Sequence, residues 1–185
     1  MDGWKAAWVW LCAAAVAAPS PVESGARAVA PSAVRMSDPF TASAVRGALQ
    51  GATRRLDRPD CQKVFGDFAD AHGRRLEENL AALGDSGRSY MGRLLFYEGT
   101  SQPLCHKRNA LAITQPGSRV VLVCGPAFTH WYRRDRFLAE AVLIHEALHT
   151  LGLGENPPSS QEITKRVLER CHQRANGARV APEEE

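Results

Sequence analysis

The most regular pattern in the chain covers residues 135–156, which read DRFLAEAVLIHEALHTLGLGEN. Spacings of three or four residues separate the apolar positions Phe137, Ala141, Ile144, Leu148 and Leu151. That period predicts one helix from about Asp135 to Leu151 with an apolar face in the core. Gly152 follows directly and suits the left-handed backbone with which many helices end.

Working outward, the residues before this helix predict strands. Residues 109–114 (NALAIT) and 119–124 (RVVLVC) flank Gln115-Pro116-Gly117-Ser118, in which Pro and Gly occupy the central positions that favour a type II turn. The two segments therefore predict a β-hairpin. Residues 93–97 (RLLFY) predict a further strand closed by Gly99.

Two more helical segments flank these elements. Residues 59–84 carry apolar side chains at helical spacing up to Gly84, and Gly73 is a point at which this segment divides into two helices. A last helix is expected from about Ser160 to Cys171. We therefore predict an α+β fold, with a short mixed or antiparallel sheet packed on the early helix and on the 135–151 helix.

Composition limits the class of protein. The chain has 185 residues, 44% apolar and 23% charged, with a net charge of +3. That length and composition suit one globular domain. The small positive excess does not indicate a nucleic-acid binder, and no apolar run is long enough to span a bilayer.

The N-terminus resembles a secretory signal. Residues 6–18 (AAWVWLCAAAVAA) are uniformly apolar, follow Lys5, and include Ala15-Val16-Ala17 as a small-x-small cleavage site. We expect a signal peptide at 1–17, a flexible linker or leader at 18–56, a folded domain at 57–175 and a disordered tail at 176–185. The protein would then be secreted or periplasmic.

The cysteine count supports an oxidising compartment. Without Cys12, four cysteines are left, namely Cys61, Cys105, Cys124 and Cys171. An even number in an exported chain predicts two disulfides, for which three pairings are possible. We favour Cys105–Cys124 together with Cys61–Cys171.

The 135–151 helix also carries chemistry. His145 and His149 are four residues apart, so their imidazoles emerge one above the other on one helix face. Two imidazoles in that arrangement converge on one zinc ion at about 2.0–2.1 Å each. Glu146 follows the first histidine and is placed to act on a metal-activated water without being a ligand.

These residues resemble the zincin metallopeptidases, whose HExxH signature reads here His145-Glu146-Ala147-Leu148-His149. The extended motif is similar to the metzincin form HExxHxxGxxH, with Gly152 at the glycine and Glu155 in place of the third histidine. No methionine follows the motif, unlike in metzincins. The resemblance implies a small zincin-like domain in which a hairpin strand aligns the substrate.

Two carboxylates compete as the third ligand. Glu155 has the metzincin spacing and is the preferred choice. Glu162 matches the downstream glutamate of the gluzincins, but Ser159-x-x-Glu162 is also a helix capping box. Both remain candidates from sequence alone.

The function expected from these residues is a secreted zinc-dependent peptidase. His145, His149 and Glu155 hold Zn²⁺, and Glu146 is the catalytic general base that takes a proton from water and passes it to the leaving amine. The substrate is a peptide or protein, with no nucleic-acid partner and no stable membrane anchor, and the protein is expected to be a monomer. The alternative is a non-catalytic secreted module that binds zinc or a partner on a zincin frame.

Overall fold

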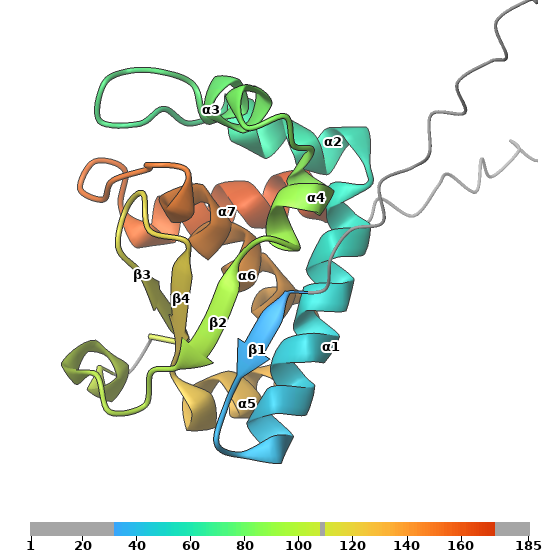
Figure 1. Cartoon of the computed structure of the whole chain (residues 1–185), viewed down its shortest axis with the longest axis vertical. Helices are drawn as coiled ribbons and strands as arrows, with labels where there is room; N and C mark the ends of the chain where they lie inside the picture. Colours follow the sequence, from blue (N-terminus) through green and yellow to red (C-terminus); the bar gives the residue numbers. More distant parts are fainter. Residues whose placement is uncertain (1–31, 108–109, 173–185) are drawn as a thin grey trace, which may run out of the picture.

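The fold is built on a four-stranded mixed sheet. The structure is a computed structural model that describes residues 32–107 and 110–172. Strands β1 (Ala33–Arg35), β2 (Leu95–Glu98), β4 (Val120–Val123) and β3 (Ala112–Thr114) lie in that order across the sheet. The first three run parallel and β3 is antiparallel to β4, so the expected α+β class with a mixed sheet is confirmed (Figure 1).

The hairpin forms where the sequence predicts it. Ala112 pairs with Val123 and Thr114 with Val121. The Ser118 N–H donates to the Gln115 carbonyl at 2.9 Å, and Gly117 has φ 78°, as a type II turn requires. Glycine suits this position because its lack of a Cβ permits positive φ.

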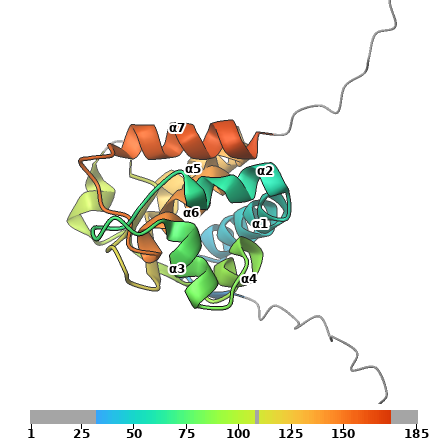
Figure 2. The same ribbon diagram turned by 90° about the horizontal axis from the view of Figure 1, so that it is seen from above.

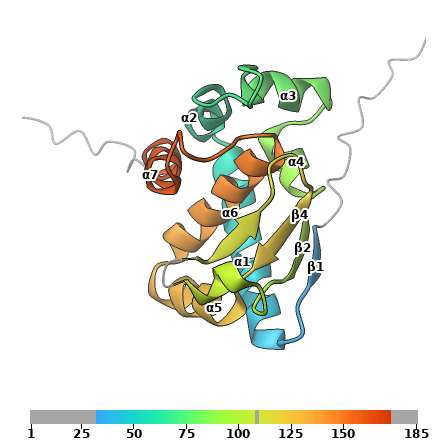
Figure 3. The same cartoon turned by 90° about the vertical axis from the view of Figure 1, so that its left-hand side faces the viewer.

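Helices cover one face of the sheet. Figures 1 and 3 show α1 (Pro39–Leu56) and α6 (Arg136–Thr150) on the same side of the strands. Phe96, Val121 and Val123 are buried, whereas Leu95 and Leu122, which alternate with them, are half-buried. The remaining elements are α2 (Pro59–Gln62), the 3-10 turn η1 (Lys63–Gly66), α3 (Leu76–Ala82), α4 (Gly87–Met91), the 3-10 turn η2 (Pro103–His106), α5 (Gly125–Arg134) and α7 (Ser160–Cys171).

The expected linker at 18–56 is wrong over its second half. Residues 33–56 form β1 and α1, and α1 buries Val45, Ala48, Ala52 and Leu56 in the core. Asp38 caps the helix by accepting from the Phe40 and Thr41 N–H groups. The folded domain therefore includes β1, at least from Ala33. The signal peptide, residues 18–31 and the 176–185 tail lie outside the described residues.

The early helical segment is more broken than its spacing predicts. Only α2, η1 and α3 are helical there, and Ala69 forms an isolated bridge with Arg75 around the turn at Gly73, which has φ 78°. Besides α1, the helices α4 and α5 were not predicted. The predicted helices at 135–151 and 160–171 correspond to α6 and α7.

Two disulfides tie distant segments together. Cys61 of α2 is bonded to Cys171 at the end of α7, and Cys105 of η2 is bonded to Cys124, which directly precedes α5. Both favoured pairings are confirmed. Figure 2 shows α7 and α2 together along one side of the molecule. Within the described ranges, every helix is too short or too polar to cross a bilayer.

Candidate metal centre

The two motif histidines face one another near the C-terminal end of α6. The residues Phe137 to Leu151 place the helix's apolar face against the core, with Ala141, Ile144 and Leu148 fully buried. His145 and His149 lie beside that face, each 4% exposed. Their Nε2 atoms are 2.9 Å apart. Two nitrogens bound tetrahedrally to one zinc at about 2.0–2.1 Å are about 3.3 Å apart, so a shift of a few tenths of an ångström accommodates an ion.

The second ring nitrogens are held by neighbouring polar groups. His149 Nδ1 donates to the Leu153 carbonyl at 2.7 Å. His145 Nδ1 lies 2.9 Å from the Thr164 hydroxyl on α7. Such contacts orient metal-binding imidazoles and keep Nε2 directed at a shared ion.

Glu155 supplies the third potential ligand. Gly152 has φ 106° and turns the chain at the end of α6, so the following loop returns past the histidines. Glu155 Oε1 lies 3.3 Å from His149 Nε2 and 3.8 Å from His145 Nε2. The ligand atoms of His145, His149 and Glu155 all lie within 4.8 Å of one another, so this group could hold a metal ion.

Glu162 has a different role. Its Oε2 accepts from the Ser159 N–H at 2.8 Å and from the Ser159 hydroxyl at 2.7 Å, which completes a capping box at the start of α7. These hydrogen bonds to Ser159 lower the pKa of Glu162. The residue is exposed. Geometry therefore brings Glu155, not Glu162, to the histidines.

The donor chemistry fits a first-row transition metal. Two imidazoles and one carboxylate are ligands that zinc accepts, and they leave a fourth position available. Imidazole also suits copper, nickel and iron, so the donor set by itself does not select one ion. Glu155 contributes the most accessible ligand, because its side chain is 41% exposed while both imidazoles are buried.

Glu146 is a buried acid beside this group. It is 6% exposed, and burial raises its pKa to about 7, with the nearby charge of Glu155 adding to the rise and the Thr114 hydroxyl opposing it. Within the described part of the chain, Glu146 Oε2 and Thr114 Oγ1 are buried without a well-aligned hydrogen bond. A carboxyl with this pKa can both accept and release a proton near neutral pH.

Other segments brace the end of α6. The Gly117 N–H in the β3–β4 turn donates to the His149 carbonyl at 2.9 Å. Asn79 of α3 donates from Nδ2 to the Leu151 carbonyl at 3.1 Å and to Asp70 Oδ2 at 2.9 Å. Sequence reasoning identified neither Asn79 nor Thr164, because only tertiary packing brings α3 and α7 to this place.

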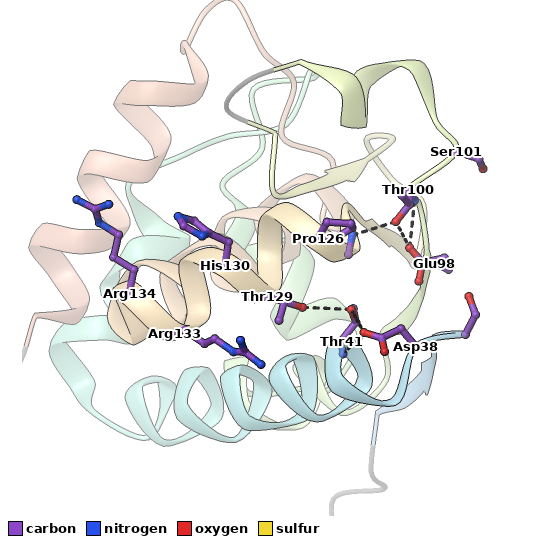
Figure 4. Close-up of a pocket in the computed structure, with 12 residues that line it drawn as sticks. Asp38, Thr41, Glu98, Thr100, Ser101, Pro126, Thr129, His130, Arg133 and Arg134 are labelled. Atoms are coloured by element: carbon purple, nitrogen blue, oxygen red, sulfur yellow. Dashed lines mark hydrogen bonds between the residues drawn. The ribbon is translucent and has the colours of Figure 1, made fainter.

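A separate cavity lies away from the histidines. It has a volume of about 1060 Å³ and lies where β1, β2 and β4 end, between the start of α1 and the length of α5 from Gly125 to Arg134 (Figure 4). Thr41 contacts both Asp38 and Thr129 there, and Thr100 donates to Glu98 while accepting from the Gly125 N–H. None of the residues lining it belongs to the His145, His149 and Glu155 group. Its two acidic side chains already have structural roles, since Asp38 caps α1 and Glu98 accepts from Thr100. We therefore take the histidines, and not this cavity, as the candidate functional site.

Comparison with known proteins adds no family assignment. No protein-family model, curated protein or solved structure matches this chain.

Proposed function

We propose that this protein is an exported, zincin-like metallopeptidase that hydrolyses peptide bonds in a zinc-dependent reaction. One observation carries the proposal, namely the convergence of His145, His149 and Glu155 on one point with the buried acid Glu146 beside them. His145, Glu146 and His149 occupy the HExxH positions, and Glu155 occupies the position at which the extended metzincin form has its third histidine. The two disulfides are compatible with an exported protein.

Three of these residues would be metal ligands and the fourth would be the general base. His145, His149 and Glu155 would hold the zinc. When bound, zinc supplies a Lewis acid that activates water and polarises the substrate carbonyl. Glu146 would accept the proton that water loses and then donate it to the leaving amine, as a buried carboxyl beside the metal ligands is placed to do.

Local packing supports a fixed geometry. The Leu153 carbonyl orients His149, and the Gly117 N–H holds the backbone at the same residue. Because the imidazoles are buried and hydrogen-bonded, little side-chain entropy is lost when they bind an ion. A preorganised ligand set of this kind favours tight binding and a defined position for the attacking water.

The experiment compares four proteins, namely wild type, Glu146→Gln, Glu155→Ala and Glu162→Ala, in zinc titrations and in cleavage of a broad quenched-peptide library. Glu146→Gln should keep zinc and lose activity by about 10²–10⁴-fold. Glu155→Ala should bind zinc much more weakly than the control Glu162→Ala, which removes a carboxylate of the capping box and no metal ligand. Full activity in Glu146→Gln would refute the general-base role.

A second function is favoured by one observation. His145, His149 and Glu146 are all at most 6% exposed, and the 1060 Å³ cavity lies away from them. Two imidazoles and an acid with so little exposed surface also suit a secreted zinc-binding module without turnover. Tight zinc binding with no cleavage of any library peptide would support this module over the peptidase.

A further inference from the structure

The two histidines differ in what faces their second ring nitrogen. His149 Nδ1 lies 2.7 Å from the Leu153 carbonyl, which only accepts hydrogen bonds. The carbonyl therefore fixes the proton of neutral His149 on Nδ1 and leaves a lone pair on Nε2. His145 Nδ1 lies 2.9 Å from the Thr164 hydroxyl, which both donates and accepts. That contact permits either tautomer of His145.

The short distance between the two Nε2 atoms determines which tautomer His145 adopts without a metal. Because Nε2 of His149 carries a lone pair, Nε2 of His145 at 2.9 Å makes a favourable hydrogen bond only if it carries the proton. His145 Nδ1 is then bare and accepts from the Thr164 O–H. Two bare Nε2 atoms at this distance would instead repel one another unless a cation lies between them.

Metal binding requires the other tautomer. Both Nε2 atoms must then offer lone pairs, so the proton of His145 must be on Nδ1. Thr164 can accept from that N–H after rotation about its C–O bond. His145 is neutral both without and with the metal. Water accepts the proton that leaves Nε2 and supplies the proton that Nδ1 gains.

The packing of α7 holds Thr164 beside His145 in either tautomer of the histidine. Its neighbours Ile163 and Val167 are fully buried, and the Ser159–Glu162 capping box fixes the start of α7. The Cys61–Cys171 disulfide fixes the other end of the helix. The hydroxyl therefore rotates while its oxygen stays in place.

We propose that Thr164 is a positioning residue that satisfies His145 in both tautomers and so allows the histidine pair to exchange its internal hydrogen bond for a shared metal ion. This inference deepens the proposed function and rests on its metal centre. Its predictions concern protonation and metal affinity, so they are measured without any substrate.

The first measurement is long-range ¹H–¹⁵N NMR of the imidazoles in the full chain, with EDTA and then with one equivalent of Zn²⁺. In EDTA, His145 should carry its proton on Nε2 and His149 on Nδ1. With zinc, both should carry it on Nδ1. A proton on Nδ1 of His145 already in EDTA would overturn the proposal.

The second measurement is zinc affinity by chelator competition, together with the visible spectrum of the Co²⁺ form. Thr164→Val keeps the shape of the side chain but removes the hydroxyl, and it should weaken zinc binding by about 10–100-fold. Thr164→Ser keeps the hydroxyl, so its zinc affinity should stay within about threefold of wild type. The matched control is Thr53→Val, which removes a hydroxyl that donates to the Leu49 carbonyl on α1.

The outcomes separate the two proposals. Equal zinc affinity and an unchanged Co²⁺ spectrum in Thr164→Val would overturn the role of Thr164 while leaving the metal centre intact. A wild-type protein that does not bind Zn²⁺ or Co²⁺ would overturn both. A loss of affinity in Thr53→Val equal to that in Thr164→Val would attribute the effect to general destabilisation and also overturn the inference.

Discussion

The two disulfides are expected to stabilise the fold unequally, because they close loops of very different length. Cys61–Cys171 spans 110 residues and Cys105–Cys124 spans 19. The chain-entropy relation gives about 4.8 kcal/mol for the longer loop and about 3.2 kcal/mol for the shorter one at 25 °C. Replacing the first pair by alanine should therefore cost about 1.6 kcal/mol more than replacing the second.

Packing also makes the loss of Cys61–Cys171 more costly than the loss of Cys105–Cys124. Cys61 and Cys171 are both fully buried, whereas Cys105 is half-buried, so the first double substitution also leaves the larger internal void. In addition, Arg55 and Arg58 both donate to the carbonyl of Cys171, so freedom at the end of α7 loosens these contacts too. Packing should therefore add to the difference of about 1.6 kcal/mol that loop length gives.

The assay is urea denaturation at pH 7, followed by far-UV circular dichroism, on Cys61→Ala/Cys171→Ala and Cys105→Ala/Cys124→Ala. Wild type with both disulfides intact is the reference. The midpoint should fall further for the first variant, with the free energy of unfolding compared through the fitted slopes. An equal loss in both variants, or a larger loss in the second, would refute the reasoning from loop length.

Two further predictions concern buried charge. Burial, followed by the nearby His149, lowers the pKa of His145 to about 3, so acid from pH 6.5 downward favours the unfolded chain, which binds the proton. Glu146, whose pKa is raised to about 7, has the opposite effect between pH 4.5 and 7, because there the folded chain binds the proton. In EDTA, the free energy of unfolding of Glu146→Gln should therefore fall relative to that of wild type by about 1 kcal/mol for each pH unit as the pH is lowered from 6.5 to 4.5. Urea denaturation measures both profiles, and parallel profiles would contradict this prediction. Glu140 is 4% exposed and its Oε2 accepts from Arg55 Nε at 2.5 Å. Glu140→Ala should cost about 3 kcal/mol, because it removes the carboxylate partner of that guanidinium and leaves it with the neutral Cys171 carbonyl as acceptor. Arg55→Met/Glu140→Leu should cost less. Thermal denaturation ranks the two variants, and the reverse order would count against a buried ion pair.

The elements predicted correctly are those with strong local signals. The three-and-four spacing from Phe137 to Leu151 defines α6, and Pro116-Gly117 defines the hairpin turn. The expected export signal and the even cysteine count predicted two disulfides, and the favoured one of three possible pairings is the pairing in the structure. For α6 and the hairpin turn, neighbouring residues carry enough information to limit the structure without knowledge of distant contacts.

The features that sequence reasoning missed depend on packing or on small side chains. The buried stripe of α1 contains Ala44, Ala48 and Ala52, whose low hydrophobicity makes the helical period weak, so the segment resembled a linker. The third ligand was left open because spacing does not reveal the path of the chain after Gly152. Thr164 could not be identified at all, since α7 reaches His145 only in the folded molecule.

The candidate ligand set is also compact along the chain, since His145, His149 and Glu155 lie within eleven consecutive residues. Little chain entropy is lost in bringing such close neighbours together, even in an unfolded polypeptide. The denatured protein should therefore compete for zinc, and added metal should raise the melting temperature by less than its affinity for the native protein implies. An ion captured by the emerging polypeptide could then nucleate the end of α6 before the sheet is complete.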